Sequence, residues 1–299
     1  MSESIVGEWA KDKLDRLRRY LKEYVKILNN QNWCRGFHYV DAFAGPGEHQ
    51  IRQLGSEQPS EDVLSLFDEA AAFQRQEPEN RDVIAGSPRV ALEVSPPFST
   101  YTFVDMNPAR VARLNDLAKH AGPSVKVISA NCSEFLRHKF IPSHNWKNER
   151  AVVFLDPFGM QVNWDTIAAL AATKGIEIFL NFPVGMAIQR LLLRDPSEYT
   201  PASRKKLDDY FGTDEWFSVM YKKRMTLFGE TQDKVADSGE ELLRWYKRRL
   251  ASAFGFVSDA SLIRNSKGGH LYYLIMAGPN KTGAKIASYV LSAGEKVRN

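Results

Sequence analysis

Five polar side chains that could bind a ligand each follow a short apolar run of the sequence. They are Asp41, Asp105, Asn131, Asp156 and Asn181. Carboxylates accept hydrogen bonds from hydroxyl and amino groups and also bind divalent cations, whereas amides both donate and accept. The set is therefore suited either to a polar small molecule or to a metal ion.

A glycine-rich turn, Asp-Ala-Phe-Ala-Gly-Pro-Gly, begins at Asp41. Gly45 and Gly47 let the backbone approach a ligand without a Cβ in the way. We expect Phe43 and both glycines to contact this ligand, and Asp41 to accept a hydrogen bond from its ammonium group, directly or through water. The turn lacks the third glycine of a dinucleotide fingerprint and a following Gly-Lys-Ser/Thr, which disfavours NAD and excludes a phosphate-gripping loop.

Two further loops carry residues suited to binding a nucleoside. Asp105 ends its apolar run as a carboxylate that can accept from two ribose hydroxyls, and Pro108 then starts a helix. Asn131 supplies an amide that can recognise an adenine amino group. Cys132 is expected to line this loop as a small buried residue, with no chemistry assigned to its thiol.

The most specific motif is Asp156-Pro157-Phe158-Gly159. Proline removes an N–H and leaves its carbonyl free as an acceptor. Asp156 and the Pro157 carbonyl can then both accept from one exocyclic NH₂ group, while Phe158 offers a ring face on which a base can stack.

The apolar runs that carry these residues predict buried strands, because each is short, nearly continuous and rich in Val, Ile, Phe or Tyr. Helix-like segments at 107–120 and 163–175 separate some of them, an alternation typical of a parallel α/β sheet. Near the C-terminus, two apolar runs flank a Ser-Lys-Gly-Gly turn and predict an antiparallel hairpin. The expected strands span 37–43, 101–105, 125–130, 152–156 and 176–181, with the hairpin at 256–264 and 270–278.

We divide the chain into an N-terminal amphipathic helix (1–30), an α/β core (31–189), a helical insertion (190–250) and a hairpin with a last helix that completes the core (251–299). The core carries an insertion of its own at 48–98, with a helical piece at 61–76. In the 190–250 insertion, cations alternate with aromatic residues, a pattern that favours a nucleic-acid surface or a solvated helix face. The candidate substrate-binding cations are Arg204, Lys205, Lys222, Lys223 and Arg248.

Composition narrows the class of protein. The 299 residues are 43% hydrophobic and carry a formal charge of +4, which permits but does not favour a nucleic-acid partner. The apolar runs are far shorter than the ~20 residues that span a bilayer, and the N-terminus lacks the features of a signal peptide. Two cysteines form neither a disulfide framework nor a four-thiolate metal site. We expect a cytoplasmic protein without a membrane or metal partner.

The four loops, in this order, resemble those of class I S-adenosylmethionine-dependent methyltransferases. That resemblance implies a Rossmann-like, mostly parallel sheet that ends in an antiparallel hairpin, with S-adenosylmethionine as cofactor. Over nearly the whole chain, the motifs Asp-Ala-Phe-Ala-Gly-Pro-Gly, Gly86-Ser87-Pro88 and Asp156-Pro157-Phe158-Gly159 are similar to those of the three-Cys-motif partner protein (TcmP) family. This family is named for its association with a separate three-cysteine, radical-SAM-like protein, which implies such a partner here.

The chain departs from the family patterns at two positions. Amino-methyltransferase loops have their aromatic residue fourth, whereas Phe158 is third here, a form closer to RNA guanine-N2 methyltransferases. Asn131 also stands where an acid is common. The leading hypothesis is therefore methyl transfer to an amino nitrogen of a nucleic-acid base, with RNA slightly favoured over DNA. The alternatives are a catalytically idle scaffold for the partner protein and a Mg²⁺-dependent phosphohydrolase or nuclease that uses Asp41, Asp105 and Asp156.

Overall fold

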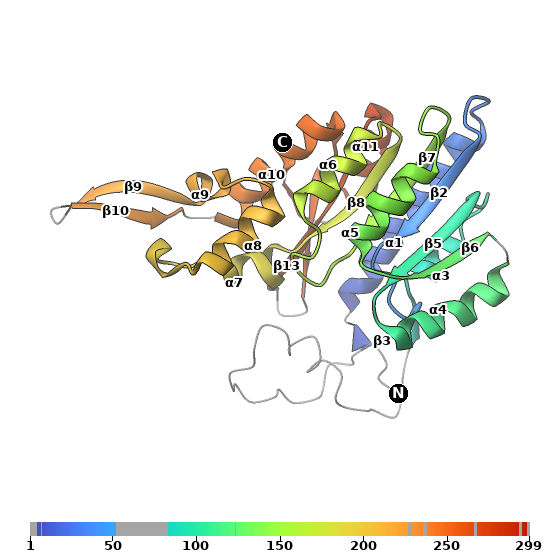
Figure 1. Cartoon of the computed structure of the whole chain (residues 1–299), viewed down its shortest axis with the longest axis horizontal. Coiled ribbons are helices and arrows are strands. Elements are labelled where there is room, and N and C mark those ends of the chain that lie inside the picture. The colour runs from blue at the N-terminus through green and yellow to red at the C-terminus, as the bar shows by residue number, and fades with distance from the viewer. Residues whose placement is uncertain are drawn as a thin grey trace.

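A computed structural model describes residues 5–6, 8–51, 83–122, 124–226, 229–235, 238–265, 268–292 and 295–297 (Figure 1). Its strands are β1 (Ile5–Val6), β2 (Gly36–Asp41), β3 (Glu48–Ile51), β4 (Val83–Ala85), β5 (Thr100–Asp105), β6 (Val125–Ser129), β7 (Glu149–Leu155), β8 (Ile176–Phe182), β9 (Tyr221–Thr226), β10 (Gly229–Lys234), β11 (Phe256–Val257), β12 (Ala260–Arg264), β13 (His270–Gly278) and β14 (Glu295–Val297). Its helices are α1 (Glu8–Asn29), α3 (Ser87–Leu92), α4 (Pro108–Ala121), α5 (Cys132–Phe135), α6 (Trp164–Ala172), α7 (Gln189–Leu191), α8 (Pro201–Phe211), α9 (Glu215–Met220), α10 (Ser238–Phe254) and α11 (Lys281–Val290), with shorter helical turns at 136–143, 184–188 and 196–198.

The main sheet has the strand order β14-β12-β13-β8-β7-β2-β5-β6, and β11 pairs with β13. From β8 to β6 the strands are parallel, whereas β13 runs antiparallel to both β8 and β12. The C-terminal hairpin is therefore inserted with its second strand inward, next to the parallel part. This arrangement confirms the predicted Rossmann-like sheet, which is mostly parallel and has an antiparallel hairpin at its C-terminal end.

The central strands β2 and β8 are buried at every residue, as their continuous apolar runs predict. Strand β6 differs, because it forms the edge of the sheet and its residues are half-buried or exposed. The expectation that every strand in this series is covered on both faces was thus wrong for β6. At the other edge, β14 adds a strand that the sequence analysis did not predict.

Helices cover both faces of the sheet. Helix α1 packs against α3 and α11, and its apolar stripe joins one side of the core. Helix α10 packs against α6 and α9, on the side whose core includes Trp216, Tyr246 and Phe182. Helix α1 thus packs on the sheet through its apolar stripe, and this packing brings the first turns of α1 close to the ends of the strands.

The two insertions have structures that the sequence analysis did not anticipate. The first begins and ends in a small sheet of order β1-β3-β4 beside the glycine turn, and the helix expected at 61–76 lies outside the described residues. The second is not wholly helical, because β9 and β10 form an antiparallel ribbon that projects from the body (Figure 1). The sequence does not predict this ribbon, because its strands are rich in charged residues and lack an alternation of apolar and polar positions. Within the described ranges, no helix is both long and apolar enough to cross a membrane.

Candidate active site

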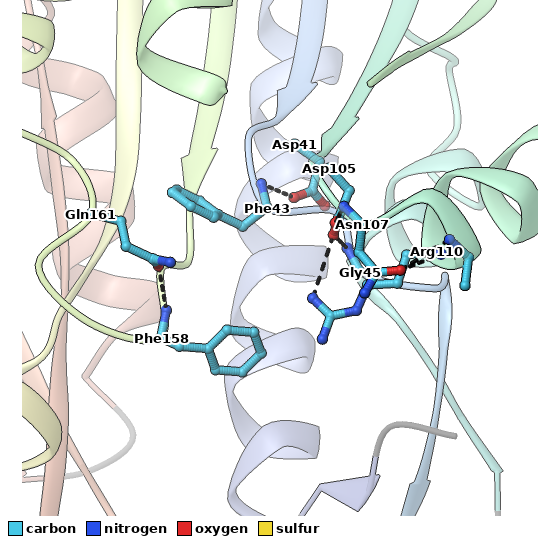
Figure 2. Close-up of polar contacts among 9 residues, drawn as sticks. Asp41, Phe43, Gly45, Asp105, Asn107, Arg110, Phe158 and Gln161 are labelled. Carbon is cyan, nitrogen blue, oxygen red and sulfur yellow. Dashed lines mark hydrogen bonds and ion pairs between the residues drawn. The ribbon is translucent and has the colours of Figure 1, made fainter. Parts of the chain in front are cut away.

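The polar strand ends come together because β5, β2, β7 and β8 are parallel neighbours. Asp41 lies opposite Phe103 on β5 and opposite Phe154 on β7, so all three strands end at the same level. The strand order reverses at β2, which is where ligands bind in open α/β sheets. Figure 2 shows the two sides of this edge, with Gly45, Asp105 and Arg110 on one and Phe158 on the other.

The glycine turn is fixed through its backbone. Gly45 and Gly47 have φ values of 63° and 82°, which favour glycine. The Ala42 N–H donates to the Phe154 carbonyl and the Ala44 N–H to the Val104 carbonyl, both at 3.0 Å, which ties the turn to the strands on either side. The backbone of the loop is thus fixed between β5 and β7 at the switch point of the sheet.

Asp41 lies beneath this loop and is completely buried. Its carboxylate accepts the Phe43 N–H at 3.3 Å and the Tyr39 hydroxyl at 3.4 Å, and the Ser87 side chain also favours the ionised form of Asp41. Burial, together with the nearby charge of Asp156, raises the pKa of Asp41 to about 7, although these hydrogen bonds oppose the shift. Asp41 therefore holds the glycine turn from its buried side and is not exposed on the solvent side of that turn.

Asp105 is held in a position suited to a ribose. Its Oδ2 accepts the Gly45 N–H at 3.0 Å and its Oδ1 accepts the Asn107 N–H at 2.8 Å (Figure 2). The Arg110 guanidinium lies 3.7 Å from Oδ2 and 5.8 Å from the centre of the Phe158 ring. Arg110 therefore spans the gap between the predicted ribose acceptor and the predicted stacking ring.

Asn131 has a structural task that the sequence analysis missed. Its Oδ1 caps α5 by accepting the N–H groups of Ser133 at 2.9 Å and Glu134 at 3.2 Å. Two such bonds use both lone pairs of that oxygen, so it has no further capacity to accept from an adenine amino group. Only the amide NH₂ remains to donate, for instance to a ring nitrogen. Cys132 is buried behind this cap, and burial raises the pKa of its thiol.

Asp156 forms the most concentrated charge cluster at this edge. One carboxylate oxygen contacts the Lys13 ammonium, and the other accepts the Asn181 amide N–H at 2.7 Å. The Lys13 side chain is only 8% exposed and that of Asp156 20%, so the ion pair is largely shielded from water. The other polar atom of the Asn181 amide, Oδ1, is buried without a hydrogen-bond partner.

The two residues after Asp156 face different environments. Pro157 is buried, whereas Phe158 is 57% exposed. The Phe158 N–H donates to the Gln161 side chain at 3.1 Å, which holds the loop in place (Figure 2). An exposed aromatic ring held by a fixed backbone is a suitable platform for a planar ligand.

The candidate substrate-binding cations lie in the second insertion, on three different elements. Arg204 and Lys205 are on α8, where Arg204 stacks on the Phe217 ring at 4.4 Å and Lys205 pairs with Asp209. Lys222 and Lys223 lie exposed on the β9–β10 ribbon, and Arg248 is exposed on α10. The alternation of cations and aromatics at Arg204 thus reflects a contact within the protein.

Lys13 and Arg110 contact the candidate site residues, but the sequence analysis did not single them out. Lys13 stands four residues before Leu17 and therefore lies on the buried stripe of α1, a signal that was available. The described residues contain no group of three or more His, Cys, Asp or Glu side chains placed to hold a metal ion. The Mg²⁺-dependent alternative accordingly gains no support from the three carboxylates.

No family model matches the sequence, and no match is found among curated proteins. Among solved structures, the chain is similar to protein LPL1258 from Legionella pneumophila, with 12% identity and a TM-score of 0.50 over 93% of this chain and 91% of that one. Weaker likenesses include TYW2 from M. jannaschii in complex with AdoMet (12% identity, TM-score 0.30, 87% of this chain and 74% of that one). At such identities, the likeness to the Legionella protein concerns the fold alone.

Proposed function

We propose that the chain is an S-adenosylmethionine-dependent methyltransferase that acts on an amino nitrogen of a nucleic-acid base, with RNA favoured over DNA. The observation that carries this proposal is the strand order of the sheet, which brings the glycine turn, Asp105 and the Asp156 loop to one switch point. A binding site for a nucleoside and a binding site for an amine are thereby adjacent.

The residues present suit this cofactor. The turn at Gly45 and Gly47 offers a backbone shelf, and Asp105 is a nearly buried carboxylate fixed by two backbone N–H groups. The ribose hydroxyls would bind Asp105 on the side where Arg110 now lies, so Arg110 would have to move aside or share the carboxylate. Asn131 would donate to a ring nitrogen of the adenine.

When bound, S-adenosylmethionine supplies a methyl carbon whose bond to sulfur breaks as the substrate nitrogen bonds to it. The chain's part is to orient that nitrogen and to accept its hydrogens. In the proposed arrangement, the base stacks on the exposed face of Phe158 and its amino group donates to Asp156 and the Pro157 carbonyl. Lys13 and Asn181 keep the carboxylate fixed, and Asp156 receives the proton that the nitrogen loses.

The likeness to the TcmP family is part of the same proposal. Residues of the second and third motifs both act on Asp41 in the first, since Ser87 lowers the pKa of Asp41 and the charge of Asp156 raises it. Three motifs that are far apart in the sequence therefore meet in one place, which supports a shared site. A three-cysteine partner protein would follow from membership of that family.

Calorimetry of the purified protein with S-adenosylmethionine, S-adenosylhomocysteine and NAD tests the cofactor. Binding of both sulfur compounds and not of NAD is expected, and absence of both would falsify the proposal. Labelled methyl transfer to RNA, to DNA and to the partner protein then tests the substrate. Cofactor binding without transfer to any of them would favour the idle scaffold.

The role of Asp156 is tested by Asp156→Asn, which retains an oxygen acceptor, beside Asp156→Ala, which removes it. Turnover should fall in both variants, because neither side chain can take up the proton, and furthest in the alanine variant, which also loses the acceptor oxygen; the affinity for S-adenosylhomocysteine should change little in either. An equal loss of turnover and cofactor affinity would show that Asp156 supports the fold of the site instead of the substrate amine.

A further inference from the structure

The Lys13 side chain places a primary amine against the Asp156 carboxylate, where the proposed substrate amine would also bind. Lys13 lies near the start of α1 and its side chain is largely shielded from water, so it reaches the loop after β7 from within the molecule. Its Nζ contacts Oδ2 of Asp156. The chain thus holds one of its own amino groups on the carboxylate to which we assign amine binding.

The surroundings of this ammonium group are those of a site that binds an amine. Asp156 provides the anionic acceptor, and the centroid of the Tyr272 ring on β13 lies 5.6 Å from Nζ of Lys13, within the range of a cation–π contact. Asn181 donates to the second carboxylate oxygen at 2.7 Å, so the two oxygens have different partners. A carboxylate and an aromatic face together recognise an amine, whether it belongs to a ligand or to the chain itself.

The Asp156 loop also borders the proposed cofactor site. A backbone hydrogen bond of 3.0 Å ties the glycine turn to β7, the strand that leads into this loop. The Arg110 guanidinium lies 3.7 Å from Asp105, the predicted ribose acceptor, and 5.8 Å from the Phe158 ring of the loop. The glycine turn, the ribose acceptor and the Asp156 loop therefore surround one site, which Lys13 contacts from α1.

Net stability does not account for the ion pair between Lys13 and Asp156. Taking two charges out of water costs free energy that their attraction largely offsets, so a buried pair contributes little relative to apolar side chains of similar volume. Two apolar residues would pack α1 on the sheet at least as well. The position of an amine on the proposed catalytic carboxylate, by contrast, has a direct chemical consequence.

We propose that Lys13 is a methyl acceptor, and that the chain transfers one methyl group from S-adenosylmethionine to its own Lys13 Nζ when no nucleic-acid substrate occupies the Asp156 loop. This inference rests on the proposed function, because it uses the same cofactor and the same carboxylate. It goes beyond that function by assigning a modification site on the chain itself.

The reaction balances with the groups already named. The Lys13 ammonium first gives one proton to Asp156, which frees the lone pair of the nitrogen. That lone pair forms the bond to the methyl carbon as the carbon–sulfur bond breaks, and the electron pair of the broken bond stays on sulfur. The products are N-methyl-lysine, which remains positively charged, S-adenosylhomocysteine, and one proton that passes from Asp156 to solvent.

The experiment incubates the purified 299-residue chain with S-adenosylmethionine that carries a deuterated methyl group, and locates the label by peptide mass spectrometry. Deuterium distinguishes new methyl groups from any that the chain already carries. One labelled methyl group at Lys13 is expected, at a first-order rate that is independent of protein concentration, because the transfer is intramolecular. Lys13→Arg should lose the label, while the guanidinium retains the ion pair with Asp156.

Two other lysines serve as internal controls. Lys247 on α10 is buried, and burial lowers its pKa to about 8, so its amine loses a proton more easily than an ordinary lysine. Lys205 on α8 is exposed and pairs with Asp209. Both should remain unlabelled, because contact with the site and not basicity decides the acceptor. Equal labelling of Lys13 and either control would show non-specific alkylation and would overturn the inference.

A binding measurement separates this inference from the proposed function. In protein labelled with ¹³C at lysine Cε, S-adenosylhomocysteine should shift the Lys13 signal, assigned with Lys13→Arg, and leave the Lys247 signal unchanged. Failure of both sulfur compounds to bind would refute the proposed function and this inference together. Absence of label at Lys13 in protein that binds the cofactor would refute the inference alone. Label at Lys13 without transfer to RNA or DNA would support the inference and count against the nucleic-acid substrate.

Discussion

The ion pair between Lys13 and Asp156 gives the sharpest test of the site as described. Both side chains are largely shielded, at 8% and 20% exposure, and the pair joins α1 to the loop after β7. Removing one partner of a buried pair leaves an uncompensated charge and costs about 3–5 kcal/mol. Because Asn181 still donates to Asp156, we expect Lys13→Met to lie near the lower limit, at about 3 kcal/mol.

The assay is a double-mutant cycle in urea. With a denaturant slope of about 3 kcal/mol/M for a chain of this size, Lys13→Met should lower the unfolding midpoint by about 1 M. Asp156→Asn alone should also destabilise, because it leaves the Lys13 ammonium buried. The double variant should recover to within about 1 kcal/mol of wild type, since neither charge then remains.

An exposed ion pair provides the control. Lys119 and Asp116 are neighbours on α4 with side chains 72% and 69% exposed, so Lys119→Met should leave the midpoint unchanged. Additive losses in the Lys13 and Asp156 variants would show that the two groups do not interact in solution. That result would refute the assignment of Lys13 to the active site.

Three further predictions concern separate parts of the molecule. Burial raises the pKa of Glu177 from 4.5 to about 7, so the folded state holds a proton that the unfolded state releases, and the free energy of unfolding falls as the pH rises between these values. Glu177→Gln should abolish this loss of stability. Urea midpoints that run parallel for both proteins from pH 4.5 to 8 would contradict the prediction. Gly212→Ala places a Cβ 2.4 Å from the Trp164 ring and should destabilise the folded protein by about 1–3 kcal/mol more than Gly122→Ala. Gly122 is the control, because it also has a positive φ but has open space around it. Equal shifts in melting temperature for the two variants would refute the steric argument. Phe158→Ala should weaken binding of a substrate base about 10- to 100-fold and leave S-adenosylhomocysteine affinity unchanged, whereas unchanged substrate binding would exclude stacking.

Much of the main sheet could be predicted because its signal is local. Strands β2, β5, β7 and β8 are almost wholly buried, so their apolar runs are continuous, and β5 and β8 lie within one residue of the predicted bounds. The α4 helix was equally clear, since Asn107 caps it and Pro108 occupies its first turn. The β9–β10 ribbon could not be found in this way, because its strands pair with each other outside the core and carry no apolar alternation.

The candidate site was likewise predictable only in part. The position of Asp41, Asp105 and Asp156 at one edge of the sheet was predictable, because polar residues that end neighbouring parallel strands must lie along the same edge. The hydrogen bonds and ion pairs of each carboxylate were not predictable, since they involve side chains and backbone groups from other helices and strands. The cap made by Asn131 illustrates the limit, because the same amide serves a helix or a ligand according to the backbone after it.

The sequence by itself determined the strands of the parallel sheet, the C-terminal hairpin, their order and the polar residues at the strand ends, because periodicity and strand termini are properties of contiguous segments. Only the tertiary structure decided that Lys13 reaches Asp156 from α1, that Ser87 acts on Asp41 from α3, and that Arg110 lies between Asp105 and Phe158. These contacts join residues as much as 143 positions apart, and they form only when the helices pack on the sheet. Charge and hydrogen-bond capacity at the site are set by that packing.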